Sequence, residues 1–297
     1  MMISRKNSHN CRKGVLAIRI LLDAVSIPGI VYIRILCATA NKMRYILYLA
    51  LLMGAIACSE NKKSKTILTI VAHPDDETAV GPVLAKYALS DKVHLLIATD
   101  GRYGVNEHAR IPAGDSLIKI REAETICSCD KLGIESPIFL RFHDGLGFRD
   151  SLNEYFNQTK KLKEVLKEKI KEVNPDLIIT FGPDGDTGHP DHRAIGDLVT
   201  EIILNEGWHE RYPIYFIGWS KDESDDPNLN YVDLKYLNVR ISFSDNDEEK
   251  LFESIRCHKS QFSEEMANEW IRREKEKKTN LFYFRELTVP RIQRTTL

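Results

Sequence analysis

Short apolar runs rich in β-branched residues recur through this 297-residue chain, and amphipathic stretches lie between them. The clearest run, residues 66–72, is typical of a strand that is covered on both faces. Four similar runs span residues 93–99, 137–140, 176–181 and 214–219. Strands that alternate with helices over about 150 residues form mainly parallel sheets. The sequence therefore predicts an α/β fold: a Rossmann-like three-layer sandwich with a mainly parallel sheet and helices on both faces.

The amphipathic stretch at residues 164–173 shows helical periodicity most clearly. Its apolar side chains fall on one helical face, Lys and Glu fill the rest, and Asn174 followed by Pro175 ends the pattern. We expect residues 66–297 to form a single domain. In such open sheets ligands bind outside the carboxyl ends of the strands, so the chemistry is expected there.

Two loops rich in His and Asp directly follow predicted strands. His73, Asp75 and Asp76 come after the first strand, and His189 and His192 come after the fourth. A lone His-Pro-Asp turn can simply be a capped helix start, because Asp favours N-caps and Pro favours the first helical turn. Two such turns at the ends of two parallel strands favour a joint site. Two imidazoles and a carboxylate with one open position are typical of catalytic zinc.

The residue types in these loops also indicate roles. Asp75 and Asp76 are adjacent in a tight turn and cannot both point at one ion, so one is free to accept a proton from water that the metal activates. His189 could then donate to a charged tetrahedral intermediate. Asp191 fits a partner that orients a ligand better than it fits a ligand. Zinc suits this donor set best, although iron or cobalt would also be accepted.

The motifs resemble those of the PIG-L/LmbE-like family of metal-dependent N-acetylglucosamine de-N-acetylases. The likeness rests on Ala-His-Pro-Asp-Asp-Glu at residues 72–77 and His-Pro-Asp-His at residues 189–192. It extends to the glycine-containing turn at 99–104, the Arg-x-x-Glu helix at 121–124 and the His-x-Ser-Gln element at 258–261. The similarity covers about residues 66–262. Arg102 departs from it, since many members carry Glu at that position.

This resemblance implies a metal-dependent hydrolase that removes an N-acetyl group from an N-acetylated amino sugar or sugar conjugate. It implies that His73, Asp76 and His192 hold Zn²⁺ or another divalent metal such as Fe²⁺. Two alternatives remain open. One is an exported sugar-binding lipoprotein without catalysis, and the other is an amide or ester hydrolase that acts on a non-sugar substrate.

The resemblance also implies roles for three further residues. Asp75 would be the general base, and His189 would be the general acid or the electrophilic partner of the oxyanion. Arg121 lies where the family has an active-site arginine, so we expect it to bind substrate. His258 is interpreted as a packing or hydrogen-bonding residue near the site. The His143-Asp144 pair could line the cleft or form a plain surface turn.

The first 57 residues differ from the rest, because they carry eight Lys and Arg but a single acid, Asp23. The uncharged run 46–57 is too short to span a ~30 Å hydrocarbon core and suits a signal peptide. It leads into Ala-Ile-Ala-Cys58, which resembles a bacterial lipobox. We expect a non-native or disordered extension at 1–42, a lipoprotein-type signal peptide at 43–58 and a linker at 59–65. The alternative for the apolar run is a buried or re-entrant helix.

These assignments predict an exported, membrane-anchored lipoprotein, periplasmic or at the cell surface, with a lipid on Cys58. A net charge of −1 gives no basic footprint for nucleic acid. Cys127, Cys129 and Cys257 are odd in number and cannot form a full disulfide framework. Cys127 and Cys129 are two apart on a predicted helix and are interpreted as core or boundary residues.

Overall fold

The computed structural model describes residues 63–222, 224–277, 279–290 and 295–296. Within residues 63–297 the chain forms one compact unit. The interpretations of residues 1–42, 43–58 and 59–62, including the lipid on Cys58, fall outside the described residues.

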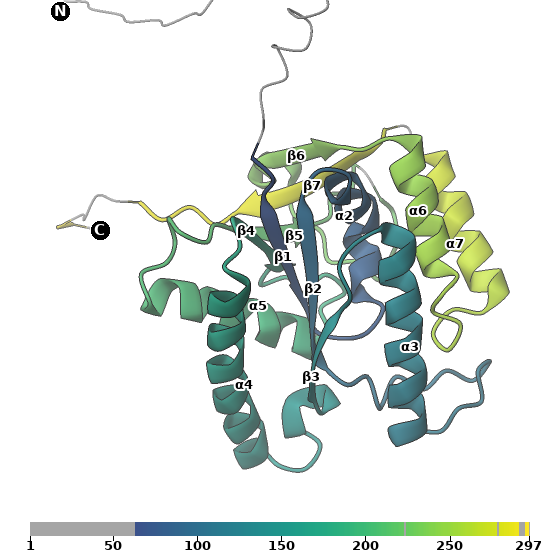
Figure 1. Ribbon diagram of the computed structural model, residues 1–297, viewed down its shortest axis with the longest axis horizontal. Coiled ribbons are helices and arrows are strands. Elements are labelled where there is room, and N and C mark those ends of the chain that lie inside the picture. The colour runs from purple at the N-terminus through teal and green to yellow at the C-terminus, as the bar shows by residue number, and fades with distance from the viewer. Residues whose placement is uncertain (1–62, 223, 278, 291–294, 297) are drawn as a thin grey trace, which may run out of the picture. The chain divides into compact units, whose positions relative to one another are not determined.

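A seven-stranded sheet runs through this unit in the order β3-β2-β1-β4-β5-β7-β6 (Figure 1). The first five strands along the chain pair in parallel, whereas β7 runs antiparallel to both β5 and β6. The strands are β1 (Thr66–Val71), β2 (Lys92–Thr99), β3 (Ile138–Phe142), β4 (Leu177–Phe181), β5 (Ile214–Gly218), β6 (Val239–Ser242) and β7 (Leu281–Glu286). All five predicted strands are present, and the predicted mainly parallel α/β fold is confirmed.

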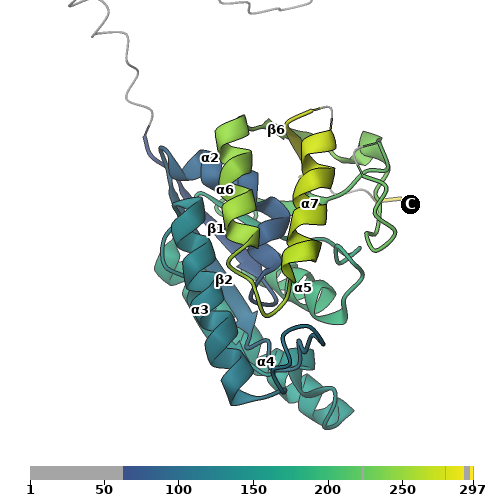
Figure 2. The same cartoon turned by 90° about the vertical axis from the view of Figure 1, so that its right-hand side faces the viewer.

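Helices cover both faces of the sheet (Figures 1 and 2). On one face lie α4 (Leu152–Val173) and α5 (Pro190–Asn205). On the other lie α2 (Gly81–Ala88), α3 (Asp115–Leu132) and α6 (Asp245–Ile255), and α7 (Glu264–Glu276) packs against α6 through a small cluster of its own. Short 3-10 helices are η1 (Asp76–Val80), η2 (Asp144–Gly147) and η3 (Leu234–Tyr236). Within the described residues, none of these helices is both long and apolar enough to cross a membrane.

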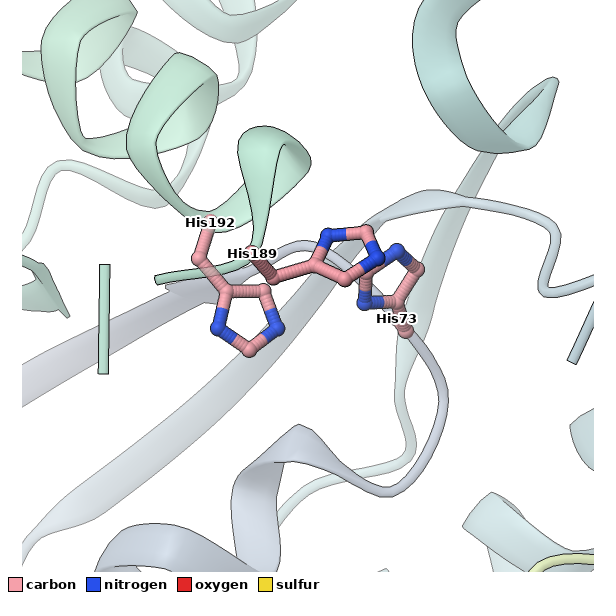
Figure 3. Close-up of side chains that lie close together, drawn as sticks. All are labelled: His73, His189 and His192. Carbon is pink, nitrogen blue, oxygen red and sulfur yellow. The ribbon is translucent and has the colours of Figure 1, made fainter. Parts of the chain in front are cut away.

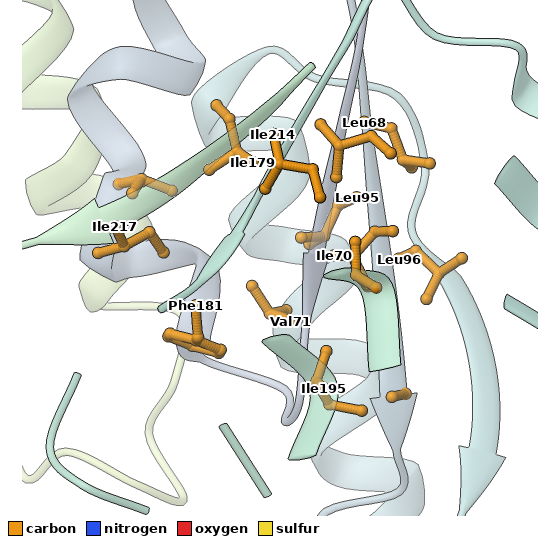
Figure 4. Packing of buried hydrophobic residues seen from close by; sticks show 14 of the residues in the cluster. Leu68, Ile70, Val71, Leu95, Leu96, Ile179, Phe181, Ile195, Ile214 and Ile217 are labelled. Atoms are coloured by element: carbon orange, nitrogen blue, oxygen red, sulfur yellow. The ribbon is translucent and has the colours of Figure 1, made fainter. Parts of the chain in front are cut away.

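The core sits where the central strands meet the helices (Figure 4). Leu68, Ile70 and Val71 of β1 are fully buried, and so are Leu95 and Leu96 of β2. These strands are sandwiched between two helical layers, which is why their sequences read as continuous apolar runs rather than as alternating ones. A central sheet buried on both faces gives the loops at its edge a rigid support.

The predicted helix at residues 164–173 is the second half of a longer helix, α4. The Ser151 side chain caps its start by accepting a hydrogen bond from the Glu154 amide, and Asn174 ends it in the left-handed conformation at φ 48°. Only Leu162, Leu166 and Ile170 of this helix are buried. The first turns carry the exposed apolar side chains Leu152 and Phe156. The apolar pattern of these turns therefore does not mark a buried face, and the sequence analysis did not extend the helix to them.

Strands β6 and β7 were missed by the sequence analysis. Val239 and Ile241 of β6 alternate with the exposed Arg240 and Ser242, because this strand lies at the sheet edge with a solvated face. Its side chains therefore lack the continuous apolar pattern that identified the buried parallel strands.

A disulfide joins Cys127 of α3 to Cys257, just after α6. The interpretation of Cys127 as a core or boundary residue was therefore wrong, because it is an exposed, bonded cysteine. The odd count leaves Cys129 as the buried free thiol among the described residues. The bond links residues 130 positions apart, so it restricts the unfolded chain over more than half of this unit.

Replacing both bonded cysteines, Cys127→Ala with Cys257→Ala, is expected to lower the free energy of unfolding by about 2 to 5 kcal/mol, because the unfolded chain regains loop entropy. Urea unfolding under oxidising conditions measures this loss. Dithiothreitol should lower the stability of the wild-type protein towards that of the variant and leave the variant unchanged. Equal stability of the oxidised wild type and the variant would contradict the role of the bond.

Candidate metal and catalytic site

The two His/Asp loops lie side by side because their strands are neighbours. β1 pairs with β4, and the strand order reverses between them, which makes this the topological switch point of the sheet. His73 follows the end of β1, whereas His189 caps α5 after β4. The two motifs therefore lie together because β1 and β4 are neighbours in the sheet. The spacing of the motifs in the sequence does not reveal this strand order.

Three imidazoles meet at this point (Figure 3). The ring centroids of His73 and His189 are 4.6 Å apart, those of His73 and His192 are 5.3 Å apart, and those of His189 and His192 are 5.1 Å apart. The His192 ring also stacks on Phe181, the last residue of β4, at 4.0 Å and 3° between planes. This packing fixes the plane of one imidazole before any ligand arrives.

The Asp76 carboxylate connects the two loops. Its Oδ1 lies 3.1 Å from His192 Nε2, and its Oδ2 lies 3.5 Å from His73 Nδ1. Oδ2 also accepts hydrogen bonds from the backbone amides of Ala72 and His73, at 3.0 and 2.7 Å. Burial opposes ionisation of this group, but His192 and His73 outweigh it and hold the pKa of Asp76 well below its ordinary value. Asp76 is therefore an anion fixed between two imidazoles.

The second nitrogen of each imidazole is already engaged. His73 Nε2 lies 3.1 Å from Asp191 Oδ2, and His192 Nδ1 lies 3.1 Å from the Gly185 carbonyl oxygen. Such outer contacts orient the histidine ligands of metal sites. Asp191 also accepts a hydrogen bond from the Gly145 amide at 2.7 Å, so the orienting carboxylate is itself held in place. The nitrogens left to bind a cation are His73 Nδ1 and His192 Nε2, and both face Asp76.

Burial lowers the affinity of both imidazoles for protons, but the carboxylates around them outweigh this effect. Asp76 and Asp191 raise the pKa of His73 well above its ordinary value, and Asp76 raises the pKa of His192. The negative charge of the carboxylates that raises both pKa values also makes this position suited to a cation.

Two sets of three side chains in the described residues bring one ligand atom each within 4.8 Å of one another: His73 with His189 and His192, and His73 with Asp144 and Asp191. Asp76 belongs to neither set, yet its oxygens contact both His73 and His192. We favour His73, Asp76 and His192, because the Asp76 carboxylate contacts one imidazole from each of the two loops. This donor set of two nitrogens and one carboxylate fits a divalent metal of the zinc type.

Asp75 is held in a strained backbone conformation with φ at 100°. Such a conformation costs about 1 to 3 kcal/mol at a residue other than Gly and persists only where the surroundings impose it. Here the Asp75 amide donates to Glu77 Oε2 at 3.1 Å, and the Asp75 carbonyl accepts from the Thr78 amide at 3.0 Å. The carboxylates of Asp75 and Asp76 consequently point in different directions, as the sequence argument required.

The Asp75 carboxylate pairs with Arg121 Nη2 at 3.0 Å. Burial raises the pKa of Asp75 to about 6, and the Arg121 charge opposes part of that rise. A carboxylate that takes up protons near neutral pH is suited to general base chemistry. The pair joins the first motif to α3, a link that sequence spacing did not reveal.

Arg121 is only 3% exposed, although it borders the cavity described below. Besides Asp75, its guanidinium donates to the carbonyl oxygens of Pro74 and, at 3.0 Å, Gly101. A Cβ atom on Gly101, which has φ at 68°, would lie 2.6 Å from this guanidinium, so the turn requires glycine there. Arg121 therefore positions Asp75, while its buried Nε has no hydrogen-bond partner among the described residues. The expected contact of Arg121 with substrate stays a prediction.

His189 differs from the other two imidazoles. Its Nδ1 accepts a hydrogen bond from the Asp191 amide at 3.2 Å and so caps α5. Burial, followed by the neighbouring His73 and His192, lowers the pKa of His189. His189 is therefore neutral near neutral pH, and its proton resides on Nε2, which is available as a donor.

A second layer of polar contacts supports the site from the His-x-Ser-Gln element. His258 Nε2 contacts Glu77 Oε1 at 2.7 Å, and both side chains are fully buried. Ser260 donates from its amide and hydroxyl to Glu124 at 2.7 and 2.6 Å. His258 is thus a buried hydrogen-bonding residue, as the sequence analysis interpreted it. The disulfide of Cys257 anchors the same segment to α3.

Asp144 is buried and holds the turn that follows β2. Its carboxylate accepts from the Thr99 hydroxyl at 2.8 Å and from the amides of Gly101 and Tyr103, each at 2.9 Å. The sequence analysis left open whether the His143-Asp144 pair lines the cleft, and Asp144 does so. These contacts fix the glycine-containing turn against the site.

A cavity of about 720 Å³ opens over the site. We call it the site cavity. It is large enough for a sugar together with part of a conjugate, since small-molecule pockets measure about 300 to 1,000 Å³. Its lining residues are His73, Asp75, Asp76, Tyr103, Gly104, Arg121, Asp144, Gly145, Phe148, Arg149, Leu152, Tyr155, Thr187, His189, Pro190, Asp191, His192 and Gln261.

The chain is similar to known proteins in sequence and in fold. Residues 68–203 match the family model of PIG-L, described as GlcNAc-PI de-N-acetylase. The chain is 32% identical over 171 residues to a 1D-myo-inositol 2-acetamido-2-deoxy-alpha-D-glucopyranoside deacetylase of Rhodococcus opacus, an alignment that covers 52% of this chain and 58% of that relative. The chain therefore spans less than two thirds of that relative's length.

A probable N-acetyl-alpha-D-glucosaminyl L-malate deacetylase 2 of Bacillus anthracis is 28% identical over 229 residues, covering 72% of this chain and 94% of that protein. The N,N'-diacetylchitobiose deacetylase of Pyrococcus horikoshii shares the fold with a TM-score of 0.55 at 20% identity, covering 82% of this chain and 92% of its own. A 4-carboxy-2-hydroxymuconate hydratase of Pseudomonas putida also shares the fold, with a TM-score of 0.56 at 15% identity. That comparison covers 78% of this chain and 100% of the hydratase chain. A deacetylase and a hydratase share this fold, so the fold alone does not decide the reaction.

His258→Phe is expected to destabilise the protein by about 3 to 5 kcal/mol, because it leaves the Glu77 carboxylate buried without its cationic partner. Urea unfolding of the variant and of wild type measures the difference. His108→Phe serves as the matched control, since His108 is exposed and contacts only the Lys259 carbonyl in the described contacts; it should cost less than about 1 kcal/mol. Equal small losses in both variants would contradict a supporting role for His258.

Proposed function

We propose that this protein is a metal-dependent N-deacetylase that removes the acetyl group from an N-acetylated amino sugar or sugar conjugate. The observation that carries the proposal is the strained Asp75, paired with Arg121 beside the cluster of His73, Asp76 and His192. The match of residues 68–203 to the family model of PIG-L supports the reaction class. The names of the Rhodococcus and Bacillus relatives support an N-acetylated glucosaminyl conjugate as substrate class.

His73, Asp76 and His192 would hold the metal, with Zn²⁺ as the best fit and Fe²⁺ as another candidate. When bound, such a cation supplies Lewis-acid chemistry, which makes water more acidic and polarises a carbonyl oxygen. The chain contributes the geometry: Asp191 and the Gly185 carbonyl orient the two imidazoles, and backbone amides fix the Asp76 carboxylate.

Asp75 is assigned as the general base that accepts the proton of the attacking water. With a pKa of about 6 the carboxylate is mostly ionised at neutral pH, yet it takes up a proton readily. Arg121 fixes the direction of this carboxylate and keeps it from turning towards Asp76. The same proton can then pass to the departing amine, which leaves acetate and a free amino sugar as products.

His189 is assigned as the group that stabilises the oxyanion of the tetrahedral intermediate. Its Nδ1 is occupied by the Asp191 amide, so Nε2 carries the proton and donates. Because the neighbouring imidazoles lower its pKa, the neutral form prevails near neutral pH. A preorganised neutral donor fits the role of electrophilic partner better than that of general acid.

Two observations bear on the alternatives. A sugar-binding protein without catalysis would not need a carboxylate held in a strained conformation against a buried arginine. Hydrolysis of an amide or ester on a non-sugar substrate would use the same residues, and the hydratase with the same fold supports a wider substrate range for the scaffold.

The experiment that tests the proposal measures acetate and free amine released from a panel of N-acetyl amino sugars, with parallel metal analysis. EDTA should abolish turnover, and Zn²⁺ should restore it. Asp75→Asn should keep the metal and lose about 10² to 10⁴ in kcat, because the amide has the same volume but cannot accept a proton. Near-normal kcat in this variant would move the base role elsewhere, and loss of metal would make Asp75 a ligand.

We further propose that the protein is exported and anchored to a membrane by a lipid on Cys58. The Cys127–Cys257 disulfide supports export, since such bonds persist in oxidising compartments. An exported enzyme would meet periplasmic or surface glycans, which favours a glycan over a cytosolic precursor as substrate.

Cys58→Ala should move the protein from the membrane fraction to the soluble fraction, because acyl chains would then provide the membrane affinity. Fractionation followed by immunoblotting measures this, with Cys11→Ala as the matched control. Unchanged membrane association in Cys58→Ala would mean that residues 46–57, not a lipid, hold the protein there.

A further inference from the structure

One wall of the site cavity carries large apolar side chains that are mostly exposed. Phe148 is 65% exposed and Leu152 is 57% exposed, although large apolar side chains are usually buried. Both line the site cavity, together with Tyr155. We call these three residues the apolar rim. They come from the end of η2 and the start of α4, outside the two His/Asp motifs.

The backbone before the apolar rim is strained in a way that presents Phe148 outward. Gly145, Leu146 and Gly147 all have positive φ, at 71°, 46° and 78°. Leu146 accepts this unfavourable conformation and is fully buried, whereas Phe148, two residues later, is exposed. Strain of this kind at a residue other than Gly concentrates at functional sites. In an ordinary surface loop nothing would require Leu146 to be buried in a strained conformation while Phe148 is exposed.

The apolar rim is tied to the catalytic residues. The Gly145 amide donates to Asp191, the carboxylate that orients His73. Three residues further on, the Phe148 ring meets the Tyr155 ring edge-on with centroids 6.2 Å apart. The apolar wall therefore has a fixed position relative to the reacting centre, as a subsite needs.

Of the two arginines that line the site cavity, Arg149 is exposed and follows Phe148 in the chain, whereas Arg121 is buried. Arg149 lies over the Tyr103 ring with 4.3 Å to the centroid, and no ion pair of this side chain occurs among the described residues. Of the four aspartates in the wall, Asp144 and Asp191 are turned towards backbone amides, and Asp75 and Asp76 are paired with Arg121 and with two imidazoles. Arg149 by itself would suit an anionic group, but the area beside it is apolar, so a ligand that crosses the apolar rim must be largely apolar.

We infer that the apolar rim is a subsite for an apolar group attached to the amino sugar, an alkyl or aryl aglycone. This inference rests on the proposed function and refines its substrate class. The size of the cavity supports it, since about 720 Å³ leaves room beyond one sugar ring, and its free wall is the apolar rim. Apolar surface removed from water in this subsite would strengthen binding of each longer chain.

The test compares methyl, butyl and hexyl glycosides of N-acetylglucosamine as deacetylation substrates of the zinc-loaded full-length protein. We expect kcat/KM to rise at least about tenfold from methyl to hexyl, because each buried CH₂ contributes to binding. Phe148→Ser combined with Leu152→Ser should abolish this rise, so that the three glycosides have similar kcat/KM. A cooperative thermal unfolding transition of the double variant shows that it is folded.

Leu204→Ser is the matched control. Leu204 is also exposed, at 46%, but it lies near the far end of α5, about 20 Å along the helix from His189. This variant should keep the rise of kcat/KM with chain length. If it loses the rise as the double variant does, the effect does not come from the apolar rim and the inference is overturned.

Two further outcomes would also overturn the inference. The first is equal kcat/KM for all three glycosides. The second is a preference for a glycoside whose aglycone carries a carboxylate, lost in Arg149→Ala, which would make the rim an anion subsite. If none of the three glycosides is deacetylated, the proposed function itself fails, and the absence of any acetate release distinguishes this result.

Discussion

The site depends on one buried carboxylate, Asp76. It accepts two backbone hydrogen bonds within its own loop and contacts imidazoles from both loops, so it fixes the end of β1 against the start of α5. Taking such an anion out of water is costly unless charge and hydrogen bonds compensate. Two backbone amides and two imidazoles do so here, and a divalent cation would do so more completely. The remaining contacts of the site are arranged around this anion.

The surrounding contacts each hold one side chain of the site in a single geometry. Asp191 and Phe181 set the two imidazoles, while Arg121 sets Asp75. Behind them the buried Glu77–His258 pair fastens the first loop to the segment after α6, and the disulfide fastens that segment to α3. Polar groups buried at this depth are stabilising only when they are satisfied. This explains why a late segment of the chain is needed by a site built from its first half.

The apolar rim and the polar site line the same cavity but differ in chemical character. The polar side is crowded with groups whose hydrogen bonds are already assigned, which suits chemistry at one small group such as an acetamide. The apolar side has exposed Phe148 and Leu152, which carry no such constraint and would accept varied partners.

The sequence by itself determined the five parallel strands, the two His/Asp loops at strand ends and the choice of residue types for a metal, because buried strands and turns leave local patterns. It did not determine the edge strand β6, in which the exposed Arg240 and Ser242 break that pattern, nor β7, which pairs antiparallel between β5 and β6. Nor did it determine the Asp75–Arg121 pair, the burial of Glu77 with His258 or the bond between Cys127 and Cys257. These contacts join residues 46 to 181 positions apart, and only the packing of α3 and α6 against the β1 loop brings them together.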